Sequence, residues 1–142
     1  MTLPSDKTMR VFLSHAHADR EWAEQFRSGL SRAGFEVWNP MNDLAPGSNP
    51  LLALGESLEQ SEAMVVLLSP DSVQLDSVIF EIEFALSSPR FRGRLVSVLV
   101  RPTAEIPWIL QKLPFIRATK DKAETVRRVI TALEKSLVPV EK

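Results

Sequence analysis

The stretch RVFLSHAHAD, residues 10–19, decides the fold, because a short apolar run ends in small and polar residues just before a helical pattern begins. Arg10–Ser14 is too short for a helix and lies between polar residues, which favours a buried strand. Residues 18–33 then repeat large apolar side chains every three or four positions, which predicts an amphipathic helix ended by Gly34. A strand that leads directly into a helix is typical of an α/β domain.

The remainder of the chain continues this alternation. We predict one short helical turn at 107–113, further strands at 35–38, 64–68, 95–100 and 114–117, and further helices at 51–61, 77–87 and 121–137. Such alternation indicates a parallel sheet with helices on both faces. Five strands fit the flavodoxin-like order 2-1-3-4-5, in which ligands bind at the carboxyl ends of the first and third strands.

Length and composition indicate one globular domain. The 142 residues are 44% hydrophobic and 25% charged, which suits a single core. We expect a flexible leader at 1–9, the domain at 10–138 and a tail at 139–142. No signal sequence or membrane-spanning run is apparent, so we expect a cytoplasmic protein without a membrane partner.

Charge and cysteine content exclude several kinds of function. A formal net charge of −1 argues against direct nucleic-acid binding that rests on phosphate neutralisation. With no cysteine, the chain has no disulfide, thiolate zinc site or cysteine nucleophile. His15 and His17 are not expected to bind a metal, because alternate residues on a turn need further ligands.

The first candidate site segment is Ser14, His15 and Ala16, directly after the first strand. Its small residues can bring backbone N–H groups close to a phosphate at the helix N-terminus. The alternative is an ordinary turn in which Ser14 or Asp19 caps the helix. Residues 29–34 have the glycine spacing of a phosphate loop, but they end a helix and lack the lysine that such a loop requires.

The second candidate segment is the helix at 77–87. Ser77, Glu81, Ala85 and Ser88 form a narrow stripe between apolar residues, so the Glu81 carboxylate is partly desolvated. Function is one reason to keep a carboxylate there. Helix periodicity alone favours the alternative of an ordinary solvated Glu81.

Two features flank these segments. Arg90, Arg92 and Arg94 bracket a turn and are expected to be solvated, with a phosphate or partner contact as the alternative. Trp38 either packs in the core or stacks on a flat ligand. It precedes the loop from Pro40 to Pro50, which is long for an α/β connection, as binding loops and lids tend to be.

Five segments, taken in order, resemble a TIR (Toll/interleukin-1 receptor) domain of bacterial type. They are VFLSHA at 11–16, GFEVW at 34–38, LAPGS at 44–48, VVLLSP at 65–70 and FEIEFA at 80–85. The likeness runs from about Arg10 to Leu137. It implies the five-stranded flavodoxin-like sheet already predicted, with a mobile loop after the second strand.

The resemblance also implies an activity. Many TIR domains cleave the nicotinamide–ribose bond of NAD+ and release nicotinamide with ADP-ribose or a cyclic isomer, so NAD+ is the substrate and no cofactor is expected. The family's catalytic glutamate lies in the pattern W-x-x-x-E-L, which Glu81 and Ile82 match, while Ser77 stands in place of the tryptophan. Glu81 is thus the implied catalytic residue, and the implied substrate-binding residues are Ser14, His15, Ala16, Trp38 and Ser77.

Family likeness further implies a homo-oligomeric TIR–TIR assembly through the Pro40 to Pro50 loop, which activates the enzyme in a defence or effector role. A fused or separate sensor module is an implied partner. One alternative is a non-catalytic TIR interaction module, which the serine at position 77 favours. Another is an enzyme similar to nucleoside deoxyribosyltransferases.

Overall fold

The sheet has the predicted topology. A computed structural model of the protein describes residues 9–39, 47 and 49–136. All strand pairs are parallel, and the order is β2-β1-β3-β4-β5. The strands are β1 Arg10–Ser14, β2 Glu36–Trp38, β3 Ala63–Leu68, β4 Leu95–Leu99 and β5 Phe115–Arg117. The flavodoxin-like α/β fold is therefore confirmed.

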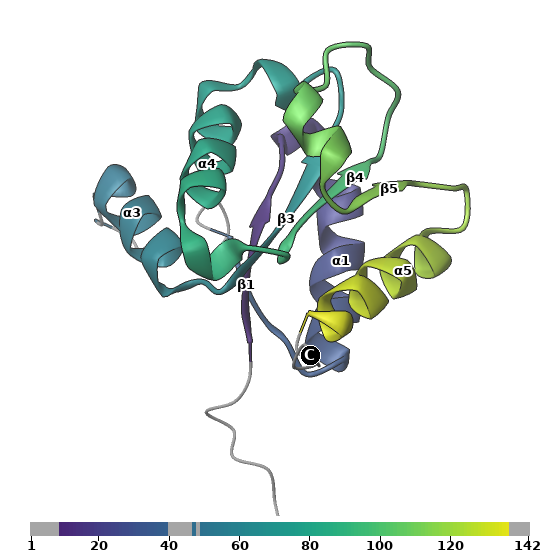
Figure 1. Cartoon of the computed structure of the whole chain (residues 1–142), viewed down its shortest axis with the longest axis horizontal. Helices are drawn as coiled ribbons and strands as arrows, with labels where there is room; N and C mark the ends of the chain where they lie inside the picture. The colour runs from purple at the N-terminus through teal and green to yellow at the C-terminus, as the bar shows by residue number, and fades with distance from the viewer. Residues whose placement is uncertain (1–8, 40–46, 48, 137–142) are drawn as a thin grey trace, which may run out of the picture.

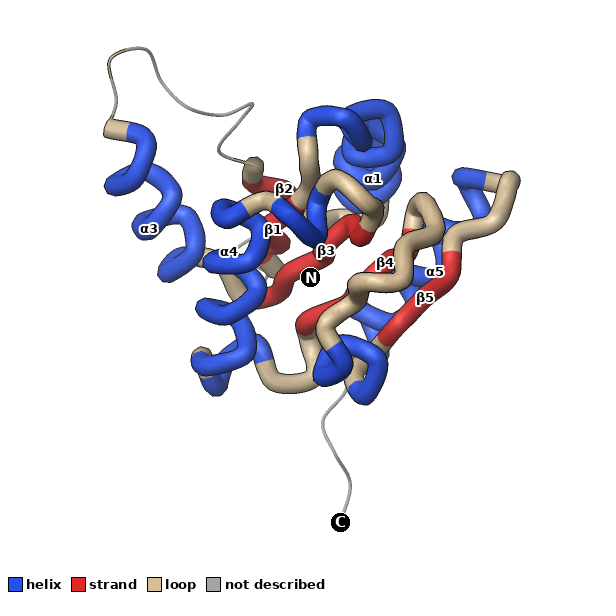
Figure 2. Tube along the Cα trace, turned by 90° about the horizontal axis from the view of Figure 1, so that it is seen from above, coloured by secondary structure: helices blue, strands red, loops and turns tan. Residues whose placement is uncertain are grey.

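Four α-helices of the described part of the chain cover the two faces of this sheet. They are α1 Arg20–Arg32, α3 Pro50–Gln60, α4 Asp76–Ser87 and α5 Lys122–Lys135. The residues that the structure describes also form four short 3-10 helices: η2 His17–Asp19, η3 Ser72–Gln74, η4 Pro89–Phe91 and η5 Trp108–Lys112. Helices α3 and α4 lie together on one side of the molecule, and α1 and α5 lie together on the other (Figure 1 and Figure 2). Within the described residues, none of these helices has the length and apolar character to cross a bilayer.

The two faces of the sheet carry separate hydrophobic cores. Alternate strand residues such as Val11, Val65 and Val98 pack with Phe26 of α1 and Val129 of α5. Their neighbours on the opposite face pack with α3, α4 and η5, and they include Phe12, Met64, Val66 and Leu99. The central strand β3 is buried along its whole length. This arrangement explains its continuous apolar sequence, because helices cover both faces.

Element boundaries differ from the predictions mainly at helix ends. Residues 17–19 form η2 rather than the first turn of α1. Gly34 has a φ of 100° and follows α1 as predicted, because glycine adopts this backbone region without a steric penalty. Gly29 lies inside α1 where a Cβ would meet Cγ1 of Val126 at 2.4 Å, so its lack of a side chain allows α1 and α5 to approach closely. Residues 1–8 of the predicted leader at 1–9, and the predicted tail at 139–142, lie outside the described residues, whereas Met9 is buried in the core.

Arg90 is not the freely solvated charge that the sequence suggested. Its guanidinium donates hydrogen bonds to the carbonyl oxygens of Leu58, Glu59 and Ser61, at 3.0, 2.5 and 2.8 Å. Carbonyl groups at the end of a helix have no partner within the helix, and arginine has enough donors to satisfy several of them. Arg90 therefore closes the C-terminal end of α3 and ties it to the turn before β4.

Candidate functional site

The site is built around a contact between two elements that are far apart in sequence. Ser14 is the last residue of β1, and Glu81 lies in the middle of α4. The Ser14 hydroxyl donates a hydrogen bond to Oε1 of Glu81 at 2.6 Å. This contact lies at the carboxyl ends of β1 and β3, where the strand order reverses and ligands bind in such folds.

Glu81 is buried, which corrects the solvated alternative. Glu81 is only 7% exposed. The reason is that Glu81 shares the inward face of α4 with Val78, Ile82 and Ala85, at helical spacings of three and four residues. Ser77 is exposed, although the sequence placed it on the same stripe as Glu81 and Ala85. The face of α4 that packs on the sheet therefore begins at Val78 instead of Ser77.

Burial changes the acidity of this carboxyl group. Desolvation raises the pKa of Glu81 from 4.5 to about 7, and the hydrogen bond from Ser14 opposes the rise by favouring the carboxylate. Neither lysine nor arginine forms a salt bridge with Glu81 in the described part of the chain. Near neutral pH the group is therefore present in both protonation states, which is typical of functional carboxyl groups.

A cavity of about 250 Å³ lies against this carboxyl group. Most of its wall is apolar, and its polar groups are few, as in small-molecule sites. The lining residues are Leu13, His15, Asn39, Pro50, Leu51, Leu54, Ser77 and Glu81. The cavity thus brings together the end of β1, the residue after β2, the first turns of α3 and the first half of α4.

The structure brings together some of the predicted site residues and separates others. His15 and Ser77 line the cavity with Glu81. Ser14 is 1% exposed and reaches the site through Glu81 rather than as part of the wall. Ala16 is also buried, and its carbonyl accepts a hydrogen bond from the Asp19 backbone N–H at 2.9 Å. Trp38 lines a different cavity, with Arg10, Glu36, Val37 and Gln60.

Most of the loop from Pro40 to Pro50 lies outside the described residues. Of its residues, the structure describes Gly47, Asn49 and Pro50. The Asn49 side chain caps α3 by accepting hydrogen bonds from the backbone N–H groups of Leu51 and Leu52, at 3.0 and 3.1 Å. Because Asn39 and Pro50 both line the cavity, the chain enters and leaves this loop beside Glu81.

Asn39 is a site residue that the sequence reasoning missed. It follows β2, is 2% exposed, and places Nδ2 at 2.7 Å from the Leu13 carbonyl oxygen and at 2.9 Å from Nδ1 of His15. No periodicity marks this position. The one available signal is that an amide directly follows a strand whose carboxyl end borders the predicted ligand crevice.

A second polar cluster ties together the segments that follow β1, β3 and β4. Asp19 is 3% exposed and accepts hydrogen bonds from Ser69 Oγ at 2.5 Å and from Arg101 Nε at 2.8 Å. Arg101 also forms an ion pair with Asp71. Asp19 makes no capping hydrogen bond to α1. Its predicted capping role is therefore wrong, because these distant partners occupy its carboxylate.

The described residues contain no group of three or more His, Asp or Glu side chains placed to hold a metal ion. The polar groups of the cavity are instead a carboxyl group, an imidazole, an amide and a hydroxyl, from Glu81, His15, Asn39 and Ser77. Such a set can bind an organic ligand by hydrogen bonds, and the carboxylate form of Glu81 can stabilise a positive charge beside it.

Comparison with solved structures identifies proteins of the same architecture. The TIR domain of the Toll-related receptor TRR-2 from Hydra magnipapillata is 23% identical, with a TM-score of 0.72 over 87% of this chain and 97% of that one. A TIR-STING receptor from C. gigas, solved with 2',3'-cGAMP, is 25% identical with a TM-score of 0.70 over 87% of this chain and 38% of that one. A prokaryotic SEFIR domain is 12% identical, with a TM-score of 0.68 over 95% of this chain and 100% of that one.

The family is given by the sequence. No match was found among curated proteins. Residues 11–130, however, match the TIR domain family. This region runs from β1 into α5 and includes Ser14, His15, Asn39, Ser77 and Glu81. The chain therefore belongs to the TIR domain family.

Proposed function

We propose that this TIR domain is an NAD+ glycohydrolase in which Glu81 is the catalytic carboxylate. The observation that carries the proposal is the burial of Glu81 against a mainly apolar cavity, where it accepts a hydrogen bond from Ser14 at 2.6 Å. A carboxylate in such a place costs stability, and stabilisation of a positive charge on a substrate is a function that requires it.

One carboxylate is sufficient for this reaction. The nicotinamide ring of NAD+ is cationic, so when its bond to the ribose C1′ breaks, the electron pair stays on nicotinamide, which leaves as a neutral base. Unlike a sugar hydroxyl, it needs no second acid to protonate it. Positive charge then develops on the ribose, and Glu81 stabilises that charge in a cavity whose wall is mostly apolar.

The fate of the ribose depends on the nucleophile. A water oxygen that bonds to C1′ and loses its proton gives ADP-ribose, whereas attack by a nucleophile within the same molecule gives a cyclic isomer. The cavity of about 250 Å³ is smaller than the usual site for a drug-sized ligand, for which roughly 300–1,000 Å³ is typical. The nicotinamide riboside end of NAD+ is therefore the part that we place against Glu81.

The test is release of nicotinamide from NAD+ by the full chain, followed by chromatography, with the protein both free and clustered on a multivalent support. Clustered wild type should release nicotinamide, and Glu81→Ala should remove the activity. Glu83→Ala is the matched control, because Glu83 lies two residues away on the exposed face of α4. Activity that survives in Glu81→Ala contradicts the assignment of Glu81.

A second candidate is a TIR interaction module without catalysis. Leu51 and Leu52 of α3, and Ile79 and Phe80 of α4, are exposed by 79, 61, 37 and 51%. The charges are also separated along the chain. Residues 33–89 carry nine Asp or Glu and no Lys or Arg, whereas residues 90–142 carry twelve Lys or Arg and five Asp or Glu.

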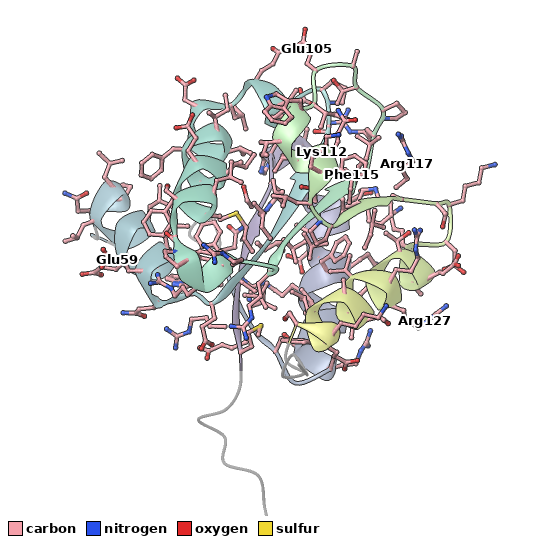
Figure 3. The ribbon with its side chains drawn as sticks, in the orientation of Figure 1. Glu59, Glu105, Lys112, Phe115, Arg117 and Arg127 are labelled. Carbon is pink, nitrogen blue, oxygen red and sulfur yellow. The ribbon has the colours of Figure 1, made fainter. Side chains whose placement is uncertain are left out.

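Some of these charges lie on different sides of the molecule, although Arg101 of the second stretch forms an ion pair with Asp71 of the first. Figure 3 shows Glu59 beside α3, while Arg117 and Arg127 lie on the side of β5 and α5. Complementary surfaces of one chain favour head-to-tail contacts between copies, and their attraction weakens as salt screens it. We propose that assembly of this kind, directed by a sensor module, controls a cytoplasmic defence or effector role. Wild type that assembles in a salt-dependent way but leaves NAD+ intact would favour the interaction module.

A further inference from the structure

Asn39 is the buried amide beside His15 in the wall of the site cavity. We propose that Asn39 is a positioning residue that holds His15 as a neutral imidazole with its proton on Nε2, so that the cavity presents a hydrogen-bond donor to an oxygen of the ligand. The identity of that ligand as NAD+ rests on the proposed function. The positioning role itself rests on the contacts among Asn39, Leu13 and His15.

The Leu13 carbonyl fixes the orientation of the Asn39 amide. Nδ2 of Asn39 lies at 2.7 Å from this oxygen. A backbone carbonyl only accepts hydrogen bonds, so the asparagine atom that faces it must be the NH₂ group and not the side-chain oxygen. A flipped amide would place two oxygen atoms at this distance.

The same NH₂ group determines the protonation of His15. Its second hydrogen is available to Nδ1 of His15, which lies at 2.9 Å. If Nδ1 carried a proton, two donors would face each other. Nδ1 therefore accepts the hydrogen bond, and the proton of the neutral ring is on Nε2.

Nε2 is the nitrogen through which His15 can meet a ligand. The imidazole ring contacts Asn39 through Nδ1, and the Leu13 carbonyl is a second hydrogen-bond partner of the ring. We place the ligand at the other ring nitrogen, Nε2. His15 lines the same cavity as Glu81. The two groups offer different chemistry, since Nε2–H donates to an oxygen acceptor, while the Glu81 carboxylate stabilises positive charge.

The electrostatic setting favours the same neutral form. Burial lowers the pKa of His15, whereas the Asp19 carboxylate and the Leu13 carbonyl oppose that change, and the charges of His17 and Glu24 have smaller and opposite effects. A neutral His15 also avoids a second cation beside the nicotinamide ring. The Leu13 carbonyl is the competitor, because it can accept a hydrogen bond from Nδ1–H if the Asn39 amide is removed.

The tautomer can be read directly by ¹⁵N NMR of the full chain. The chain has two histidines, so a His17→Gln variant assigns the spectrum. Wild type should show His15 with its proton on Nε2, and Asn39→Ala should move that proton to Nδ1. The matched control is Asn49→Ala, which removes an amide that caps α3 but does not contact His15. A wild-type spectrum with the proton on Nδ1 overturns the proposal even if Asn39→Ala does not fold.

Binding of NAD+ tests the consequence for the ligand. In the Glu81→Gln background, which blocks turnover, Asn39→Ala should weaken NAD+ binding roughly tenfold, because the ligand oxygen then meets a lone pair instead of a donor. Asn49→Ala should bind within about threefold of its parent, since Asn49 is an exposed helix cap that makes no hydrogen bond to His15 in the described structure and leaves the His15 tautomer unchanged. Unchanged NAD+ binding by an Asn39→Ala variant that has switched tautomer overturns the ligand contact. If Glu81→Gln binds no NAD+ while the wild-type tautomer is as stated, the proposed substrate fails and the positioning role stands.

Discussion

Replacement of Glu81 by glutamine should make the protein less sensitive to alkaline pH. The carboxyl group has a pKa of about 7 in the folded protein and 4.5 as its ordinary value. The folded state therefore binds the proton more tightly than the unfolded state. The resulting stability is present in full below about pH 4.5 and is lost as the pH rises through about 7.

The size of the effect follows from the same two values. A shift from 4.5 to about 7 corresponds to about 3 kcal/mol of unfolding free energy, because one pKa unit is worth 1.36 kcal/mol. Glutamine does not titrate. The unfolding free energy of Glu81→Gln minus that of wild type should therefore rise by about 3 kcal/mol between pH 4.5 and pH 8.5. Titration of all other groups cancels in this difference.

Urea denaturation across this pH range measures the effect. The midpoint should change while the slope of free energy against urea stays the same in both proteins, since the surface exposed on unfolding is unchanged. Glu83→Gln, on the exposed face of α4, serves as the control and should give a constant difference from wild type. A difference between Glu81→Gln and wild type that stays within about 0.5 kcal/mol at every pH would refute the claim that burial of Glu81 controls its acidity.

Three further substitutions test the packing and the site. Ser97 has a buried Oγ without a hydrogen-bond partner in the described structure, so Ser97→Ala should raise the unfolding free energy by about 1 kcal/mol in urea denaturation. Gly29→Ala should lower it by about 1–3 kcal/mol, since the new Cβ would lie 2.4 Å from Cγ1 of Val126, and Val126→Ala should remove most of that loss. Ser77→Trp should lower the KM for NAD+ about fivefold in the nicotinamide-release assay, because an indole at the cavity wall adds about 1 kcal/mol of stacking.

The fold could be predicted because its signals are local. Short apolar runs gave the five strands, and the spacing of Val126, Val129 and Leu133 gave α5, whose inward face these residues form. Strand order followed from the alternation of strands and helices. Helix ends were less certain because they depend on contacts between neighbouring turns. The first helix was predicted to begin at residue 18, but residues 18 and 19 belong to η2 and α1 begins at Arg20.

The site could be predicted only in part because its contacts join distant residues. Glu81 was singled out by its apolar neighbours and by the resemblance to TIR domains, although helix periodicity alone favoured a solvated side chain. Its partner Ser14 is 67 positions away. Asn39 and His15 are 24 positions apart, and Asp19 and Arg101 are 82 apart. No periodic pattern relates such pairs. Trp38 was assigned to the site by its position beside the loop, but β2 lies at the edge of the sheet and places it against another cavity.

The most direct test of the central claim is the pH dependence of kcat/KM for NAD+ cleavage by clustered protein. This quantity reports the acidity of the essential group in the free enzyme. If the ionised Glu81 stabilises the ribose cation, kcat/KM should rise with pH and level off above about 7, and Glu81→Gln should lack both the activity and the rise. A profile that is flat in wild type, or one that Glu81→Gln retains, would contradict the proposed role of this carboxylate.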